Sequence, residues 1–219
     1  MKPSQAKKTI VLSVSLAVSL ILLAVAWQFN RYVSGLPPAL NIANYQVNKV
    51  GLTDQTDGAK IKPDDLLPGC GGPDCLKSLD QPRLETIVSA NTWLNDDDRV
   101  IGLVFDGTAR VYPEKLLNHH VVVNDVINLK PVVISYNPLT YSAAAYRPLV
   151  ATINTQYGDS GLVHQSGVVL YDRLQGNLWE QSTGQAILGP AAQANEQLES
   201  IPLSFTTWKI WKEAHPDTR

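Results

Sequence analysis

The N-terminal segment constrains the chain more than any other feature. Three lysines within the first eight residues precede a run from Thr9 to Trp27 that contains no charged residue. A helix rises about 1.5 Å per residue, so this run nearly spans a hydrocarbon core of about 30 Å. The lysines place the N-terminus in the cytoplasm. We therefore predict a cytoplasmic tail over residues 1–8, a transmembrane anchor over residues 9–30 and an extracytoplasmic remainder.

The alternative for this segment is a cleaved signal peptide. Ala24-Val25-Ala26 has the small-x-small form of a cleavage site, which would leave a mature protein that begins at Trp27. The uncharged run is longer than the apolar core of a usual signal peptide, which favours the retained anchor. We therefore expect a single-pass protein of the cell inner membrane. Its N-terminal helix would lie in the lipid bilayer, and its C-terminal domain in the periplasm or outside the cell.

The charge of the chain excludes one class of partner. Its formal net charge is −2, and no cluster of basic residues follows the first eight residues. A nucleic-acid partner needs a concentrated Lys/Arg face, so we expect no nucleic acid. Hydrophobic residues make up 44% of the 219 residues, which is enough for one membrane segment and one domain with a sizeable core.

Cys70 and Cys75 are the only cysteines, and both lie in the segment PGCGGPDC. The four intervening residues are rich in Gly and Pro, which lets the two Cα atoms approach, and an oxidising compartment would preserve the bond. We predict a structural disulfide. The alternative is a metal or redox pair, which is less favoured because no further cysteine completes a tetrahedral site and the spacing is not C-x-x-C.

The remainder of the chain divides into two parts of different composition. Residues 31–68 are polar and turn-forming, as in Leu36-Pro37-Pro38, and indicate a spacer. Residues 69–219 alternate short β-branched runs with turn signals, which is typical of short strands. We therefore predict an α+β, mostly β fold. The N-terminal transmembrane helix would be followed by one antiparallel β-rich domain with short helices.

Local signals predict individual elements of this domain. RVIGLVFDGTARVYP turns at Asp106-Gly107, which indicates a type I′ hairpin because both central residues need φ > 0. Two short helices are expected: PEKLLN, with Pro113 at its first position, and FTTWKIWKEAHPDTR, with Trp208 and Trp211 on its inner face. The further expected strands are HVVVNDVI, PVVISY, SAAAYRPLVATI, GVVLYD and NLWEQS.

Five blocks of the domain resemble one known family. They are GGPDCLKSLDQP, DGTARVYPEKLLNHHVVVND, SYNPLTYSAAAY, GDSGLVHQSGVVLYDRLQGNLWEQSTGQAILGP and TTWKIWKEAHPDT. In this order, from about Gly71 to Thr218, they resemble the bacterial and archaeal domain-of-unknown-function family numbered 3179. The most specific parts are Ala-Arg-x-Tyr-Pro, Asn-Asp, Ser-Gly-Leu and Tyr-Asp-Arg followed by Leu-Trp-x-Gln. The resemblance implies a fold and the location of a site, and it implies no reaction.

The chain departs from the family pattern at that implied site. Family members usually carry Cys-Pro-Leu-Cys where this chain has Asn137-Pro138-Leu139-Thr140. Two thiols at that spacing can bind a soft metal or form a disulfide, and Asn and Thr can do neither. The family's Trp-His-Glu is His119-His120-Val121 here, and its Tyr-Asn-Ser is His164-Gln165-Ser166. The resemblance therefore implies a copy that kept its fold and lost or changed its chemistry.

The histidines have a functional and a structural interpretation. His119, His120 and His164 would form an imidazole metal site if Asp125 or Asp172 joined them. Adjacent strand residues point to opposite faces, however, so His119 and His120 would not bind one ion together if the strand has already begun there. We favour one packed and one surface histidine.

Two pairs of polar residues, each with one aspartate, also have a functional and a structural interpretation. Asn124-Asp125 either orients His120 or forms a turn within an apolar run. Asp172 and Arg173 favour a structural ion pair over a catalytic acid, because a neighbouring cation keeps a carboxyl ionised. Asp96-Asp97-Asp98 lacks the alternating ligands of a calcium loop and indicates a solvated turn. Ser160 and Ser166 lack the G-x-S-x-G form of a nucleophile elbow.

Two classes of function follow. The first is a non-catalytic accessory or binding subunit, which would act with a protein partner in a membrane-associated complex and would hold no cofactor and no metal. The second is a metal-binding or redox enzyme with a redesigned site around His120 and the Asn137 to Thr140 turn. The absence of the Cys pair at that turn favours the first. The candidate pocket comprises His120, Asn124, Asp125, Tyr136, Asn137, Thr140, Ser160, Gln165, Ser166, Asp172 and Arg173.

Overall fold

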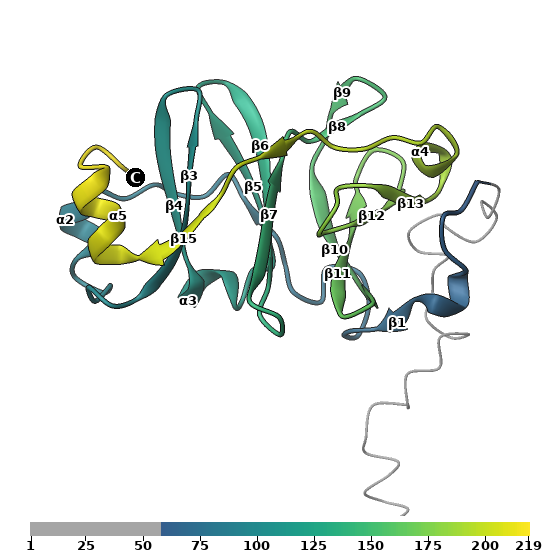
Figure 1. Ribbon diagram of the computed structural model, residues 1–219, viewed down its shortest axis with the longest axis horizontal. Coiled ribbons are helices and arrows are strands. Elements are labelled where there is room, and N and C mark those ends of the chain that lie inside the picture. Colours follow the sequence, from purple (N-terminus) through teal and green to yellow (C-terminus); the bar gives the residue numbers. More distant parts are fainter. Residues whose placement is uncertain (1–57) are drawn as a thin grey trace, which may run out of the picture. The chain divides into compact units, whose positions relative to one another are not determined.

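A computed structural model describes residues 58–219 (Figure 1). The predicted tail, the predicted anchor and most of the predicted spacer lie outside the described residues. Among residues 58–219, no helix has both the length and the apolar character needed to cross a membrane. The described part is a mostly antiparallel β domain with few short helices, which confirms this part of the predicted fold class.

The strands are β1 (Leu67–Pro68), β2 (Leu79–Asp80), β3 (Arg99–Phe105), β4 (Thr108–Pro113), β5 (Val122–Ile127), β6 (Lys130–Asn137), β7 (Ser142–Tyr146), β8 (Leu149–Val150), β9 (Ile153–Asn154), β10 (Tyr157–His164), β11 (Gly167–Asp172), β12 (Leu178–Glu180), β13 (Ala186–Leu188), β14 (Ser200–Ile201) and β15 (Ser204–Thr207). The helices are η2 (Pro63–Asp65), α2 (Ile87–Ala90), α3 (Glu114–Leu117), α4 (Pro190–Gln193) and α5 (Trp208–Ala214).

Three sheets lie side by side from left to right in Figure 1. Sheet I has the order β15-β3-β4, sheet II the order β14-β7-β6-β5-β2, and sheet III the order β1-β10-β11-β12-β13. Within the described sheets, neighbouring strands are antiparallel except for β2 and β5, which are parallel. β8 and β9 form a separate two-stranded ribbon.

Sheet II is buried on both faces. Val122 and Val133 belong to the apolar cluster shared with sheet III, which also contains Trp179. Val123 and Ile134 belong to the cluster shared with sheet I. Successive strand residues point to opposite faces, so a strand between two packed layers needs apolar residues at consecutive positions. This explains why the sequences of β5 and β6 contain β-branched runs instead of a clean alternation.

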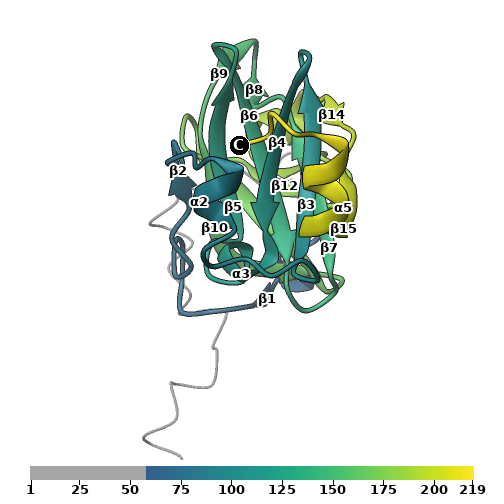
Figure 2. The same cartoon turned by 90° about the vertical axis from the view of Figure 1, so that its left-hand side faces the viewer.

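The outer face of sheet I is covered by α2 and α5, which lie in front of it in Figure 2. Trp208 and Trp211 are 1% and 4% exposed and pack on Val100, as predicted for an inner face. A Cβ added at Gly102 of β3 would collide with the ring of Trp211, so glycine is required there for this packing.

Three local predictions need correction. The helix begins at Trp208, and Phe205 to Thr207 belong to β15, because they pair with β3 and Thr is favoured in strands. Pro113 precedes the first residue of α3 as its N-cap. The strand expected over SAAAYRPLVATI ends at Tyr146, because Pro148 has no N–H to donate to a ladder.

β10 and β1 are among the strands that were not predicted. β10 contains Gly158, Asp159, Ser160 and Gly161, residues that are depleted in strands, and its register against β11 shifts between Asp159 and Leu162. Its pairing with β11 places it in the sheet despite that composition. β1 lies in the segment predicted as a spacer and pairs with β10, so the end of that segment is part of sheet III.

Candidate functional site

The Asn137 to Thr140 turn connects β6 with β7 and contacts the turn between β10 and β11. The Asn137 side chain is 1% exposed. Its Nδ2 donates a hydrogen bond to the Ser166 carbonyl oxygen at 2.7 Å, and its Oδ1 accepts one from the Leu139 N–H at 3.0 Å. Asn137 therefore ties the end of sheet II to a turn of sheet III. Thr140 is exposed, and its hydroxyl contacts that of Ser142 at 2.8 Å.

Substitution should separate these two turn residues. Asn137→Ala leaves the Ser166 carbonyl oxygen and the Leu139 N–H without this partner, so we expect the free energy of unfolding to fall by about 1–2 kcal/mol. Thr140→Ala removes an exposed hydroxyl, and we expect a change below about 0.5 kcal/mol. Urea denaturation of both variants measures the difference. Equal effects would show that Asn137 does not tie the two turns together.

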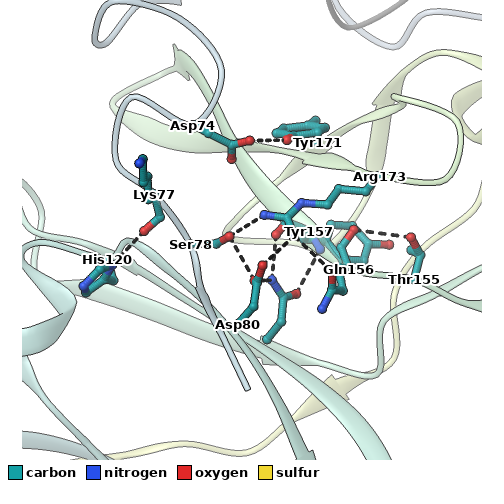
Figure 3. Close-up of polar contacts among 11 residues, drawn as sticks. Asp74, Lys77, Ser78, Asp80, His120, Thr155, Gln156, Tyr157, Tyr171 and Arg173 are labelled. Atoms are coloured by element: carbon teal, nitrogen blue, oxygen red, sulfur yellow. Dashed lines mark hydrogen bonds and ion pairs between the residues drawn. The ribbon is translucent and has the colours of Figure 1, made fainter. Parts of the chain in front are cut away.

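The histidines do not meet at this turn. The His120 ring Nδ1 lies 2.7 Å from the Lys77 carbonyl oxygen, as Figure 3 shows. His119 is exposed, and the buried His164 contacts Glu180 at 3.2 Å. Among the described residues, the His, Cys, Asp and Glu side chains close enough together to hold a metal ion include none of these histidines. The imidazole site considered from the sequence is therefore not assembled.

Asn124 and Asp125 both lie buried within β5, so the expectation of a turn there was wrong. Asn124 donates to the Tyr157 carbonyl oxygen at 2.8 Å and accepts from the Tyr157 N–H at 2.9 Å. These bonds join sheet II to sheet III. Asp125 accepts a hydrogen bond from the Tyr112 hydroxyl at 2.7 Å, on the side of sheet I. Burial, and then the charge of Asp125, raises the pKa of Tyr112. Neither residue contacts His120 through these bonds.

Arg173 belongs to a polar network on one side of this junction (Figure 3). Its guanidinium donates to Asp80 at 2.7 Å and to Gln156 at 3.0 Å, and Asn124 donates to Asp80 at 2.7 Å. Burial opposes the charged form of Asp80. The hydrogen bonds from Arg173, Asn124 and Ser78 outweigh it and hold the pKa of Asp80 below its usual value. The expected Asp172–Arg173 pair was therefore wrong, because Asp80 is the partner of Arg173.

Asp172 organises the loop that follows it. The residue is fully buried. Its Oδ1 accepts hydrogen bonds from the N–H groups of Leu174 and Gln175, and its Oδ2 accepts from Asn177 and from the Trp179 indole at 2.8 Å. The carboxylate is thus held by donors of its own chain segment, as a structural group.

A pocket of about 380 Å³ lies beside the Asn137 to Thr140 turn. Glu114 lines it, accepts a hydrogen bond from the Tyr136 hydroxyl at 2.6 Å and pairs with Arg99 at 2.7 Å. The Arg99 guanidinium lies 4.5 Å from the centre of the Tyr141 ring. Burial and the bond to Glu114 raise the pKa of Tyr136 well above its usual value. The pocket is lined by Arg99, Val100, Ile101, Glu114, Tyr136, Tyr141, Phe205, Thr206 and Thr207.

The predicted disulfide between Cys70 and Cys75 is present, with Cα atoms 6.3 Å apart. Sequence reasoning missed the residue beneath it. Asp159 of β10 is 4% exposed, and its Oδ2 lies 3.5 Å from Cys70 Sγ and 3.3 Å from Cys75 Sγ. These three residues form a group close enough to hold a metal ion, but in the oxidised form neither sulfur is a thiolate. No local pattern relates Asp159 to cysteines so far away in the sequence.

The other candidate residues take part in turns and ladders. Ser160 donates to the Val169 carbonyl oxygen at 2.6 Å within sheet III. Gln165 and Ser166 form the turn between β10 and β11 with φ of 48° and 67°, and Gln165 is exposed. The structure thus distributes the predicted pocket over several places: Asn137 and Ser166 meet, Tyr136 lines the pocket, and Asn124 and Arg173 share the network around Asp80.

Comparison with known proteins gives one match. A family model described as "Protein of unknown function (DUF3179)" matches residues 73–219. No curated protein and no solved structure matches the chain. The matched range contains the Asn137 to Thr140 turn, the 380 Å³ pocket and Asp159, and it begins after Cys70.

Proposed function

We propose that the chain, which belongs to the family of proteins of unknown function DUF3179, acts by binding a partner. The family assignment by itself names no reaction. In this proposal the chain is a membrane-anchored, extracytoplasmic binding domain. It serves as an accessory subunit of a membrane-associated complex, and its partner is a protein.

The observation that carries this proposal is the pocket of about 380 Å³ beside the Asn137 to Thr140 turn. Two of its aromatic lining residues, Tyr141 and Phe205, are 58% and 57% exposed. Exposed aromatic side chains around a hollow are typical anchors of protein interfaces. Glu114 is held by both Arg99 and Tyr136, so its charge is compensated, and the pocket suits an apolar side chain with a hydrogen-bonding group.

The bonds of Asn137 support the same role. Both polar groups of its side chain are used to hold the turn that leads to Tyr141. The turn therefore supports a wall of the pocket. The alternative function, a metal-binding or redox enzyme centred on His120 and Asn137 to Thr140, is less well supported because His120 contacts the Lys77 carbonyl oxygen and Thr140 contacts Ser142.

Two observations support the proposed location. The uncharged run from Thr9 to Trp27 has the length and the flanking lysines of a membrane anchor. The Cys70–Cys75 disulfide is typical of proteins outside the cytoplasm, where thiols are not kept reduced.

Photo-crosslinking in cells tests the proposal. A photoreactive residue replaces Phe205 in the full chain, and we expect one crosslinked protein partner in the membrane fraction. Tyr141→Ala in the same photoreactive chain should lower recovery of that partner by about tenfold, because truncation of an anchor side chain weakens binding strongly. The matched control is Leu129, which is 95% exposed at the opposite end of the β5–β6 hairpin from Tyr136.

Three outcomes would contradict the proposal. The same crosslinks at Leu129 would show that the pocket is not the contact surface. A mature protein that begins at Trp27 in the soluble extracytoplasmic fraction would refute the anchor. One equivalent of copper, iron or zinc in protein purified without chelators, lost in His120→Ala, would favour the metal enzyme.

A further inference from the structure

The Cys70–Cys75 disulfide lies at the surface with one buried acid beneath it. Cys75 is exposed and Cys70 is half-buried, so Cys75 is the more accessible residue of the pair. An open cavity of about 570 Å³ adjoins the disulfide loop and is lined by its residues Pro73 and Asp74. Asp159 lies on the inner side of the bond, within 3.5 Å of both sulfurs. A disulfide with a purely structural role needs neither an exposed cysteine nor a carboxyl group beside its sulfurs.

The surroundings of Asp159 favour its neutral form. Its Oδ1 accepts a hydrogen bond from the Gly161 N–H at 2.9 Å, and none of the ion pairs among residues 58–219 includes it. The nearby Asp74 is acidic as well, and the Tyr171 hydroxyl donates to its Oδ2 at 2.5 Å (Figure 3). Asp74 Oδ1 is buried without a hydrogen-bond partner among the described residues.

Burial raises the pKa of Asp159, the hydrogen bonds from the Gly161 and Leu76 N–H groups oppose this, and the charge of Asp74 adds to it, so that the pKa is about 6. A carboxyl with such a pKa exchanges its proton near neutral pH. This is the property that a proton donor and acceptor needs.

We propose that Cys70–Cys75 is a redox-active disulfide that exchanges with a dithiol, and that Asp159 supplies and recovers the proton of Cys70. The class of reactant is a protein or small-molecule dithiol that reaches the disulfide from the adjoining cavity. This inference rests on the contacts of Asp159 and is independent of the 380 Å³ pocket.

Reduction by a dithiol proceeds in two balanced steps. A thiolate of the reductant attacks Cys75 Sγ, the bond between the two cysteines breaks, and a mixed disulfide forms at Cys75. Cys70 leaves as a thiolate and takes the proton of the Asp159 carboxyl. The second thiol of the reductant gives its proton to Asp159. The resulting thiolate attacks the reductant's first sulfur, which is bonded to Cys75 in the mixed disulfide. Cys75 then leaves as a thiolate and takes a proton from water. Two electrons pass from the dithiol, which becomes a disulfide, to the two cysteines.

The pH dependence of reduction by dithiothreitol tests this role in the oxidised full chain. The rate is measured by mass spectrometry of alkylated thiols and divided by the concentration of dithiothreitol thiolate. An ionised Asp159 repels both the incoming and the leaving thiolate, and a neutral one donates a proton. We therefore expect the normalised rate to rise by about tenfold as pH falls from about 7.5 to about 5.5, with a midpoint near 6.

Two variants complete the test. In Asp159→Asn the normalised rate should be independent of pH. Asp74→Asn removes the neighbouring charge without touching the sulfurs, so the pH dependence should remain and its midpoint should move to lower pH. A wild-type disulfide that dithiothreitol does not reduce in the folded chain, or a normalised rate constant over this pH range, would overturn the proposal. An unchanged midpoint in Asp74→Asn would overturn it even if Asp159→Asn failed to fold.

Discussion

Asp172→Ala is expected to lower the free energy of unfolding by about 3–5 kcal/mol. The wild-type carboxylate is fully buried and accepts five hydrogen bonds, from the Leu174, Gln175 and Asn177 N–H groups, the Asn177 amide and the Trp179 indole. Alanine leaves these donors without their acceptor, and each unpaired buried donor costs about 1–3 kcal/mol before relaxation and water entry reduce the total. Urea denaturation of the oxidised chain measures the loss.

Asp96→Ala is the matched control for this prediction. Asp96 is exposed and pairs with Lys212 at the surface. Exposed ion pairs contribute little to stability, so we expect its free energy of unfolding to stay close to that of the wild type. If Asp172→Ala were no more destabilised than Asp96→Ala, the buried carboxylate would not organise the loop between β11 and β12.

The contribution of Asp159 to the stability of the folded chain should fall as pH rises from about 4 to about 6. Its pKa is about 6 in the folded chain and 3.8 as the usual value, so the folded state binds the proton more tightly than the unfolded state. Stability linked to this group is present below the unfolded pKa and is lost as pH rises through the folded pKa. The difference of about 2 pKa units corresponds to a loss of about 3 kcal/mol at neutral pH.

Comparison with Asp159→Asn isolates this effect from other carboxyl groups. The pKa of Asp80 is lowered by its partners, and so is that of Asp98, where the hydrogen bond from Lys115 is the main cause. The stability that such groups contribute is lost as pH falls, which is the opposite of the pH dependence expected from Asp159. We therefore expect the wild type to become less stable relative to Asp159→Asn as pH rises from about 4 to about 7. Denaturation of both chains at several pH values measures this, and a constant difference would contradict it.

Several elements followed from short-range chemistry. Asp106 and Gly107 adopt φ of 52° and 74°, as the predicted type I′ turn requires. Trp208 and Trp211 share the inner face of α5 because they are three residues apart on a helix. The Cys70–Cys75 bond needed only a short flexible loop. In each case the partners are close in sequence, so their geometry is set by a few backbone angles.

The polar groups followed a different rule. Asn124 bonds Tyr157 across two sheets, Arg173 pairs with Asp80, and Asp159 lies beneath a disulfide that is distant in sequence. A side chain such as Asn or Asp can satisfy its hydrogen bonds with many partners, and its neighbours along the chain do not select among them. The order of the strands selects among them.

The same distinction explains β10 and the two-sided burial of sheet II. The glycines and the aspartate between Gly158 and Gly161 have low strand propensity. They are held in place by β11, which pairs with Gly158 and Asp159, and by the Gly69 and Asp74 N–H groups, which donate to the Gly161 and Asp159 carbonyl oxygens. The valines of β5 and β6 indicated strands, but a run of apolar residues does not say how many layers cover it. Local composition therefore indicated most of the longer strands, the hairpin turn and the resemblance to the family. Pairing between distant strands set which side chains meet, because the free energy of burying a polar group depends on partners that the fold alone brings together.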